Sequence, residues 1–250
     1  MENNEIPRVS IIGVPISAVN LDSCVRQIEK HLDEVKGQYI CVSNVHTTVI
    51  AHNEPDYFRV QAESFLSVPD GKPLSVIGRR QYPQMGRVTG PELMRRLFEE
   101  SRRKGYRHYF YGNTPENLEL LVTKLRSRYP HLNIVGYEPS VFRALSTQEE
   151  EELIRRVTAA APDFLWVGLG APRQERFCAA MKGRIPALMI GVGGAFNVLA
   201  GLIPEAPEWM QNSGLEWLYR LSREPGRLFG RYLTTNTKFL YYQLTKRPPS

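Results

Sequence analysis

Short apolar runs alternate with helix-like segments along most of the chain. The runs are four to six residues long, which is typical of buried strands, and most precede a segment with apolar residues at helical spacing. The predicted strands are Val9–Val14, Tyr39–Val42, Phe65–Val68, Arg107–Tyr111, Ile134–Tyr137, Phe164–Gly168 and Leu188–Val192. The predicted helices begin near Leu21, His46, Pro91, Pro115 and Thr147. This order predicts an α/β fold with a mainly parallel sheet and helices on both faces.

The pattern changes after Gly201-Leu202-Ile203-Pro204, and a second proline follows at position 207. We therefore predict two parts, a Rossmann-like α/β domain over residues 1–203 and a small helical appendage over residues 204–250. In a parallel α/β sheet the functional crevice lies beyond the carboxyl ends of the strands. The loops that follow the predicted strands are thus the places to search for chemistry.

The end of the chain is basic, whereas the rest is neutral overall. Residues 217–250 hold seven basic residues and one acidic residue, which accounts for the whole net charge of +6. The same stretch also holds seven aromatic residues. This combination indicates an anionic partner, and charge alone leaves open a membrane surface, a phosphate-bearing ligand or a nucleic acid.

The sequence favours a reducing compartment. No basic segment leads into an apolar stretch near the start, and no apolar run approaches the about 20 residues that span a bilayer. The three cysteines, Cys24, Cys41 and Cys178, form no C-x-x-C motif. We therefore expect the protein in the cytoplasm or peripherally on a membrane.

Two of the loops after strands carry polar candidates. Asn44 follows the second predicted strand, where its amide suits either sugar hydroxyls or the cap of a helix. Asp70 lies between Pro69 and Gly71 after the third strand. A carboxylate fixed there suits a general base, but a turn aspartate that bonds its own backbone has the same pattern. Spacing alone leaves both alternatives open at each position.

Three further loops can bring backbone N–H groups close to phosphate oxygens. The first precedes a helix N-terminus, where a capped helix without a ligand has the same pattern, and the other two are rich in glycine. They contain Gly112, the segment 168–175, and the segment 191–197 with Gly191, Gly193 and Gly194. None forms a G-x-G-x-x-G or G-x-x-x-x-G-K-[ST] motif. A nucleotide site is therefore plausible, whereas an NAD or ATP site is not supported.

The residue pattern favours chemistry without a metal or a cofactor. The chain has no D-x-D pair and no His or Cys spacing typical of zinc sites. The charge of a phosphate leaving group would then be met by arginines or helix N-termini. Arg220 and Arg223 share one helix face, and Arg227 and Arg231 share another after a predicted break at residues 224–226.

Together these segments resemble the WecG/TagA/CpsF family, glycosyltransferase family 26. The resemblance covers about residues 12 to 240. It rests on Ser43-Asn44, Val68-Pro69-Asp70-Gly71, Arg87-Val88-Thr89-Gly90-Pro91-Glu92-Leu93, Gly136-Tyr137, Gly168-Leu169-Gly170-Ala171-Pro172-Arg173-Gln174-Glu175, Gly191-Val192-Gly193-Gly194-Ala195-Phe196-Asn197, Ala206-Pro207-Glu208-Trp209-Met210 and Gly214-Leu215-Glu216-Trp217-Leu218-Tyr219-Arg220-Leu221.

The resemblance implies an inverting, metal-independent glycosyltransferase of bacterial surface-polymer synthesis. It would move a sugar, most often N-acetylmannosamine, from a UDP donor to a sugar on undecaprenyl diphosphate at the inner face of the plasma membrane. Carried over by motif, Asp70 is the general base, with Asn44 and Arg87 positioning the substrates. The implied donor contacts are Gly112, Tyr137, Gln174, Gly191, Gly193, Gly194 and Asn197. Arg220, Arg227 and Arg231 belong to the appendage that meets the membrane and the diphosphate.

Three points remain open in the sequence. The donor sugar could instead be glucose or glucuronic acid, each as its UDP derivative. A nucleic-acid-binding module with a basic tail is a remote alternative, and a nucleotide-sugar epimerase would need a redox fingerprint that the sequence lacks. We expect a UDP-sugar, a polyprenyl-linked acceptor and the membrane as partners, with no nucleic acid, and the sequence leaves a homo-oligomer open.

Overall fold

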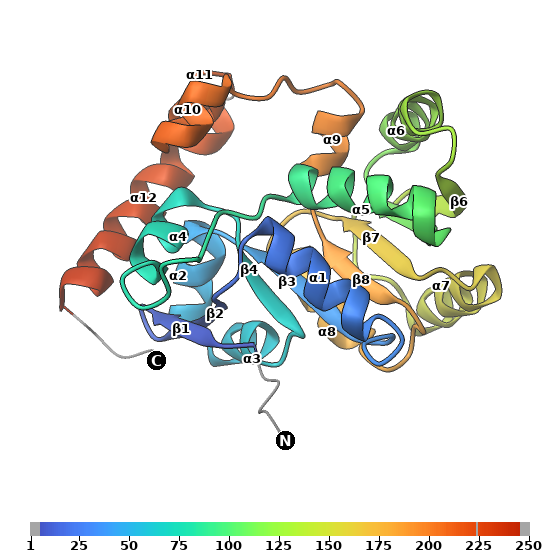
Figure 1. Cartoon of the computed structure of the whole chain (residues 1–250), viewed down its shortest axis with the longest axis horizontal. Coiled ribbons are helices and arrows are strands. Elements are labelled where there is room, and N and C mark those ends of the chain that lie inside the picture. Colours follow the sequence, from blue (N-terminus) through green and yellow to red (C-terminus); the bar gives the residue numbers. More distant parts are fainter. Residues whose placement is uncertain (1–5, 224, 246–250) are drawn as a thin grey trace.

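The computed structural model describes residues 6–223 and 225–245, and its centre is a parallel β-sheet (Figure 1). Six strands lie in the order β4-β3-β8-β7-β5-β6, all parallel to their neighbours. Their bounds are β3 (Tyr39–Ser43), β4 (Leu66–Pro69), β5 (Arg107–Gly112), β6 (Asn133–Glu138), β7 (Phe164–Gly168) and β8 (Leu188–Gly191). The predicted α/β fold with a Rossmann-like parallel sheet is confirmed.

Helices cover both faces of this sheet. The apolar side chains of α1, α5, α6 and α9 pack on one face, and those of α7 and α8 pack on the other. The helices of this part of the chain are α1 (Leu21–His31), α2 (Val45–Asn53), α3 (Pro55–Ala62), α4 (Lys72–Gly78), α5 (Gly90–Lys104), α6 (Pro115–Arg128), α7 (Thr147–Ala160), α8 (Arg173–Ala180) and α9 (Ala195–Leu199). The sequence analysis did not anticipate α3 and α4.

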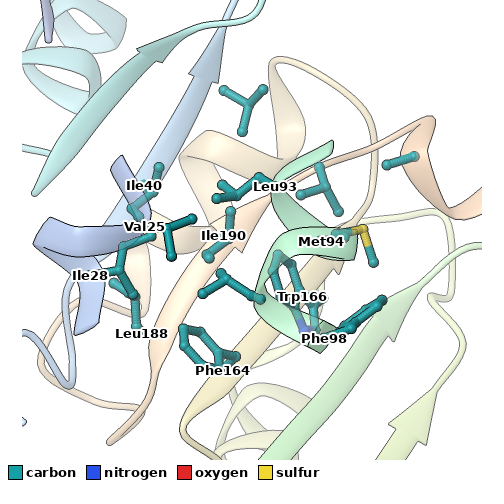
Figure 2. Packing of buried hydrophobic residues seen from close by; sticks show 14 of the residues in the cluster. Val25, Ile28, Ile40, Leu93, Met94, Phe98, Phe164, Trp166, Leu188 and Ile190 are labelled. Carbon is teal, nitrogen blue, oxygen red and sulfur yellow. The ribbon is translucent and has the colours of Figure 1, made fainter. Parts of the chain in front are cut away.

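The strands bury alternate side chains on opposite faces, because successive side chains of a strand point to opposite sides. On β7, Phe164 and Trp166 enter the cluster beneath α1 and α5, whereas Leu165 and Val167 enter the cluster beneath α7 and α8. Figure 2 shows Phe98 of α5 against Trp166, with ring centroids 5.7 Å apart. The sheet is thus buried on both faces and supports its loops rigidly.

The predicted strand Val9–Val14 is wrong as a single element of the main sheet. The chain instead forms β1 (Arg8–Ile11) and β2 (Val14–Ser17), a separate antiparallel hairpin. Ile12 and Gly13 make the turn with φ values of 47° and 84°. The sequence did not indicate this turn, because Ile12 is buried within it and is as apolar as a strand residue.

The appendage consists of α10 (Glu208–Ser213), α11 (Glu216–Arg223) and α12 (Pro225–Thr245). α12 packs along α2: the ring of Tyr242 stacks on His52 with centroids 3.9 Å apart, and its hydroxyl donates to Asn53 at 2.8 Å. The predicted break falls where α11 ends and α12 begins. Within residues 6–223 and 225–245, no helix combines the length and the apolar character that a membrane span requires. The division at residue 203 stays a prediction.

Candidate active site

The candidate residues follow the strands at one edge of the sheet. Asn44 follows β3 and Asp70 follows the neighbouring strand β4, with Ser43 and Pro69 in register. The backbone N–H of Asp70 donates to the carbonyl of Ser43 at 2.8 Å. The glycine loops after β8 and β7 come next along the edge, because β8 pairs with β3 on one side and with β7 on the other. The parallel sheet therefore gathers most of the predicted loops at its carboxyl edge.

Asp70 is partly buried and has an electrostatic environment suited to a base. Burial raises the pKa of Asp70 to about 6, with Arg220 and Arg87 acting to lower it and Glu216 and Glu92 acting to raise it. A carboxylate with this pKa is mostly ionised at neutral pH and holds an accepted proton better than an ordinary aspartate. Asp70 is thus chemically fitted to deprotonate a hydroxyl.

Arg87 lies beside this carboxylate and connects three parts of the chain. Its loop is held against β4 by a backbone hydrogen bond of 2.8 Å from Val88 to Pro69. Its guanidinium donates to Glu92 of α5 at 2.9 Å, to Gln211 of α10 at 2.9 Å and to Glu216 of α11 at 2.7 Å. The side chain is only 14% exposed. Arg87 therefore ties the appendage to the edge of the sheet where Asp70 lies.

Arg220 reaches the same cluster from the appendage. Its guanidinium pairs with Glu216 at 2.7 Å. Burial lowers the pKa of Arg220, but the carboxylates of Glu216 and Asp70 oppose this and leave that pKa raised. The structure thus brings Arg220 together with Arg87 and Asp70. The predicted partners Arg227 and Arg231 have side chains outside the described part of the chain.

Asn44 caps a helix. Its Oδ1 accepts from the backbone N–H of Thr47 at 3.2 Å, and the Thr47 hydroxyl accepts from the backbone of Asn44 at 2.9 Å, which forms a capping box. This geometry confirms the cap interpretation. A substrate contact by Asn44 stays a prediction, and it would fall to the amide nitrogen.

Gln174 is almost fully buried and joins the two glycine loops. Its Oε1 accepts from the backbone N–H of Gly170 at 3.1 Å, and its Nε2 donates to Glu175 at 2.8 Å. A Cβ added at Gly191 would lie 2.9 Å from the Gln174 side chain, and one at Gly193 would lie equally close. In this structure Gln174 braces the loops, and a direct contact with a nucleotide stays a prediction.

Gly112 is the last residue of β5, and Asn197 lies next to the residue that follows it. A Cβ added at Gly112, whose φ is +123°, would lie 2.7 Å from the backbone of Gly168, so only glycine fits there. The next residue, Asn113, donates its amide to Asn197 of α9 at 2.7 Å. Sequence reasoning missed Asn113, although its position directly after a strand is the signal that singled out Asn44 and Asp70.

Tyr137 and Gly194 lie differently from the other candidates. Tyr137 is on β6, at the opposite end of the sheet from β4, and Arg126 of α6 lies over its ring at 5.9 Å from the centroid. Five strand spacings of about 4.8 Å place β6 about 24 Å from β4. The structure therefore does not bring Tyr137 to Asp70. Gly194 lies at the start of the short helix α9 with no atom within 4 Å of an added Cβ.

Across the described residues 6–223 and 225–245, no three His, Cys, Asp or Glu side chains gather in a way that could hold a metal ion. Expected chemistry without a metal or cofactor stays a prediction. The groups available at the site are one carboxylate base, an amide, glycine-rich backbone and two guanidinium groups.

The comparison with known proteins shows the family to which this chain belongs. The family model described as "Glycosyl transferase WecG/TagA/CpsF family" matches residues 9–249. The chain belongs to this glycosyltransferase family. It is 31% identical over 221 residues to the N-acetylglucosaminyldiphosphoundecaprenol N-acetyl-beta-D-mannosaminyltransferase of Bacillus subtilis (strain 168), covering 87% of this chain and 84% of that protein. The protein of the same name from Bacillus spizizenii (strain ATCC 23059 / NRRL B-14472 / W23) is 29% identical over 210 residues, covering 83% and 80%.

For a glycosyltransferase the cluster around Asp70 has an evident use. Glycosyl transfer needs a base for the attacking hydroxyl and cations for the departing phosphate. The cluster contains groups of both kinds, the carboxylate of Asp70 and the guanidinium groups of Arg87 and Arg220, and their roles stay a prediction. Sequence reasoning missed the carboxylate at its centre, Glu216, although Glu216 belongs to the segment Gly214–Leu221 that carried the resemblance.

Proposed function

We propose that this glycosyltransferase moves N-acetylmannosamine from a UDP donor to N-acetylglucosamine carried on undecaprenyl diphosphate. Two relatives that match more than four fifths of the chain carry names with this sugar and this acceptor. The names do not state the donor nucleotide, and we take UDP from the resemblance. The observation that carries the chemistry is the partly buried Asp70 carboxylate beside two arginines, with a pKa raised by burial to about 6.

The proposed reaction is a single displacement. Asp70 takes the proton of the acceptor hydroxyl, whose oxygen forms a bond to the anomeric carbon of the donor sugar. The bond between that carbon and the β-phosphate oxygen breaks, and its electron pair leaves with UDP, so the configuration at the anomeric carbon inverts. Arg220 and Arg87 are cations that act on the Asp70 carboxylate, and they are suited to meet the charge of the departing diphosphate.

The appendage supports the proposal that the enzyme works at the inner face of the cytoplasmic membrane. The side chains of Phe229, Leu233, Leu240 and Leu244 are 60 to 82% exposed. They lie at helical spacing along α12, and the helix carries basic residues in the same stretch. A helix with exposed apolar residues and positive charge is suited to an anionic lipid surface. A lipid-linked acceptor would be met at that surface.

The test is turnover with a set of UDP-sugars and a short-chain prenyl diphosphate that carries N-acetylglucosamine. We expect UDP release and a disaccharide product with UDP-N-acetylmannosamine, in the presence of a chelator. Product formed only from UDP-glucose or UDP-glucuronate would replace the donor sugar in the proposal. Activity that is lost with the chelator and returns with manganese would contradict the metal-independent mechanism.

A further inference from the structure

Two guanidinium groups lie close enough to Asp70 to lower its pKa, yet neither pairs with it. In the described ranges, Arg87 and Arg220 make no ion pair with the Asp70 carboxylate within 4.0 Å. Both pair instead with Glu216: its Oε2 accepts from Arg87 at 2.7 Å, and its Oε1 lies 2.7 Å from Nη2 of Arg220. The carboxylate of Glu216 thus pairs with both arginines that act on the proposed base.

We propose that Glu216 is a positioning residue that holds Arg87 and Arg220 off Asp70, so that Asp70 remains free to accept a proton. This inference rests on the proposed function of Asp70 as the base. Glu216 does not touch the reacting atoms in this proposal and acts through the two arginines. It lies at the start of α11, so the role also makes the docked appendage a condition for an effective base.

The physical reason lies in what an ion pair does to a base. An opposite charge within about 4 to 6 Å stabilises a carboxylate and lowers its pKa by about 1 to 3 units. A base with a lower pKa accepts a proton less readily, so the rate of general-base catalysis falls. Without the charge of Glu216, Arg220 would have Asp70 as its main remaining carboxylate partner. The base would then be held in an ion pair.

Other charged groups around the cluster do not replace Glu216. Glu92 of α5 also acts on Asp70, but it already accepts from Arg87 at 2.9 Å and from the backbone of Thr89. Tyr232 of α12 acts on Arg220 as a weaker partner than either carboxylate. Glu216 is the carboxylate that contacts both guanidinium groups, which makes it the residue to change.

The experiment compares the pH dependence of kcat for the full-length enzyme and for Glu216→Gln, using UDP-N-acetylmannosamine and the short-chain acceptor. The substitution keeps the shape of the side chain and removes its charge. We expect the acid limb of the profile to move to lower pH by about one unit or more, and kcat on the plateau to fall about threefold to tenfold. Glu216→Ala provides a second test with the same expected shift, and thermal melting checks that each variant is folded.

A matched control is available a few residues earlier in the chain. Glu205 also links this part of the chain to the body, but its ion pair is with Arg95 of α5 and not with Arg87 or Arg220. Glu205→Gln is the same chemical change and should leave the acid limb in place. In the double variant Glu216→Gln/Arg220→Gln the limb should return toward the wild-type position, because the released cation is gone.

The outcomes separate this inference from the function on which it rests. An active wild type whose profile coincides with that of Glu216→Gln would overturn the role of Glu216 and leave the proposed function intact. A shift of the limb to higher pH would also overturn it. A wild type that transfers no sugar from any UDP donor would instead overturn the proposed function.

Discussion

The α/β body and the appendage differ in how much of their apolar surface is exposed. In the body, Phe164, Trp166 and Leu188 have no exposed surface. In the appendage, Trp209 and Leu233 are more than 60% exposed. A body that buries its apolar surface stabilises itself, whereas an appendage that displays such surface is suited to another apolar phase. The comparison is consistent with the proposal that the body carries the chemistry and the appendage meets a membrane surface.

A single helix shows both kinds of surface. Along α12, Phe239 and Tyr242 are buried in an apolar cluster shared with the body. Leu240 and Leu244, one turn apart, are 60% and 82% exposed. One face therefore fixes the helix to α2, and other apolar residues remain uncovered in this chain. The appendage is docked on the body through α12, and it is tied to the catalytic edge through Arg87 and Glu216.

The largest expected effect comes from changing the base in the body. Asp70→Asn keeps the size of the side chain and removes its ability to accept a proton at neutral pH. We expect kcat to fall by about a hundredfold or more, the range for a lost general base. UDP affinity, measured by calorimetry, should stay within a few fold of the wild type. Near-normal turnover would remove Asp70 from the chemistry.

Changes to the exposed apolar residues of the appendage should weaken membrane binding instead of catalysis. Leu233→Ser together with Leu244→Ser removes two exposed apolar side chains, each worth about 1.5 to 3 kcal/mol when fully buried. We expect binding to anionic lipid vesicles, measured by co-sedimentation, to weaken by at least about tenfold. The control is Val141→Ser, which removes a side chain that is 49% exposed on the body. Equal weakening by the control would mean that the exposed appendage residues are not a membrane surface.

The core of the body should be more sensitive than the appendage to the same substitution. Trp166 donates its indole N–H to Nδ1 of the buried His108 at 3.0 Å. Burial lowers the pKa of His108 to about 3, so the ring stays neutral and needs that donor. Trp166→Phe should therefore lower the free energy of unfolding by about 1 to 3 kcal/mol, measured by urea denaturation. Trp209→Phe in the appendage should change it by less than about 0.5 kcal/mol.

The last prediction needs no substitution and concerns the pH dependence of the wild-type rate, which should be flat near neutral pH. The pKa of Asp70 is raised to about 6, and only the ionised form accepts a proton. Activity should therefore be constant above about pH 7 and fall tenfold per unit as the pH drops below 6. Glu175, whose pKa burial raises to about 7, is the alternative source of such a limb. If the acid limb disappears in Glu175→Gln, the titrating group is Glu175 and not Asp70.

The sequence predicted the parallel sheet and the loops that share its carboxyl edge, because buried strands and the loops after them follow directly from apolar runs. It missed the hairpin of β1 and β2, since an apolar turn looks like a strand. It also left open which role Asn44 and Gln174 take, because an amide that bonds backbone three or four residues away has the same sequence pattern as one that binds a substrate.

The cluster of Arg87, Glu216 and Arg220 marks the limit of sequence reasoning. Arg87 and Glu216 are 129 positions apart, and no local pattern indicates that they pair. Sequence motifs indicated Asp70 and Arg87 as candidates. The role of Glu216 follows only from the three-dimensional structure, in which its carboxylate contacts both arginines. Long-range ion pairs depend on how the appendage docks, which is decided by the packing of α12 on α2.

The most direct measurement compares turnover on two acceptors, one short-chain and water-soluble and the other embedded in anionic vesicles. If the body performs the chemistry and the appendage binds the membrane, Asp70→Asn should lose about a hundredfold or more of its turnover on both acceptors. The Leu233→Ser/Leu244→Ser variant should turn over the soluble acceptor at the wild-type rate and should be slower than the wild type only on the vesicle-embedded acceptor. Loss of activity by the appendage variant on both acceptors, or normal activity of Asp70→Asn on either, would contradict this division of roles.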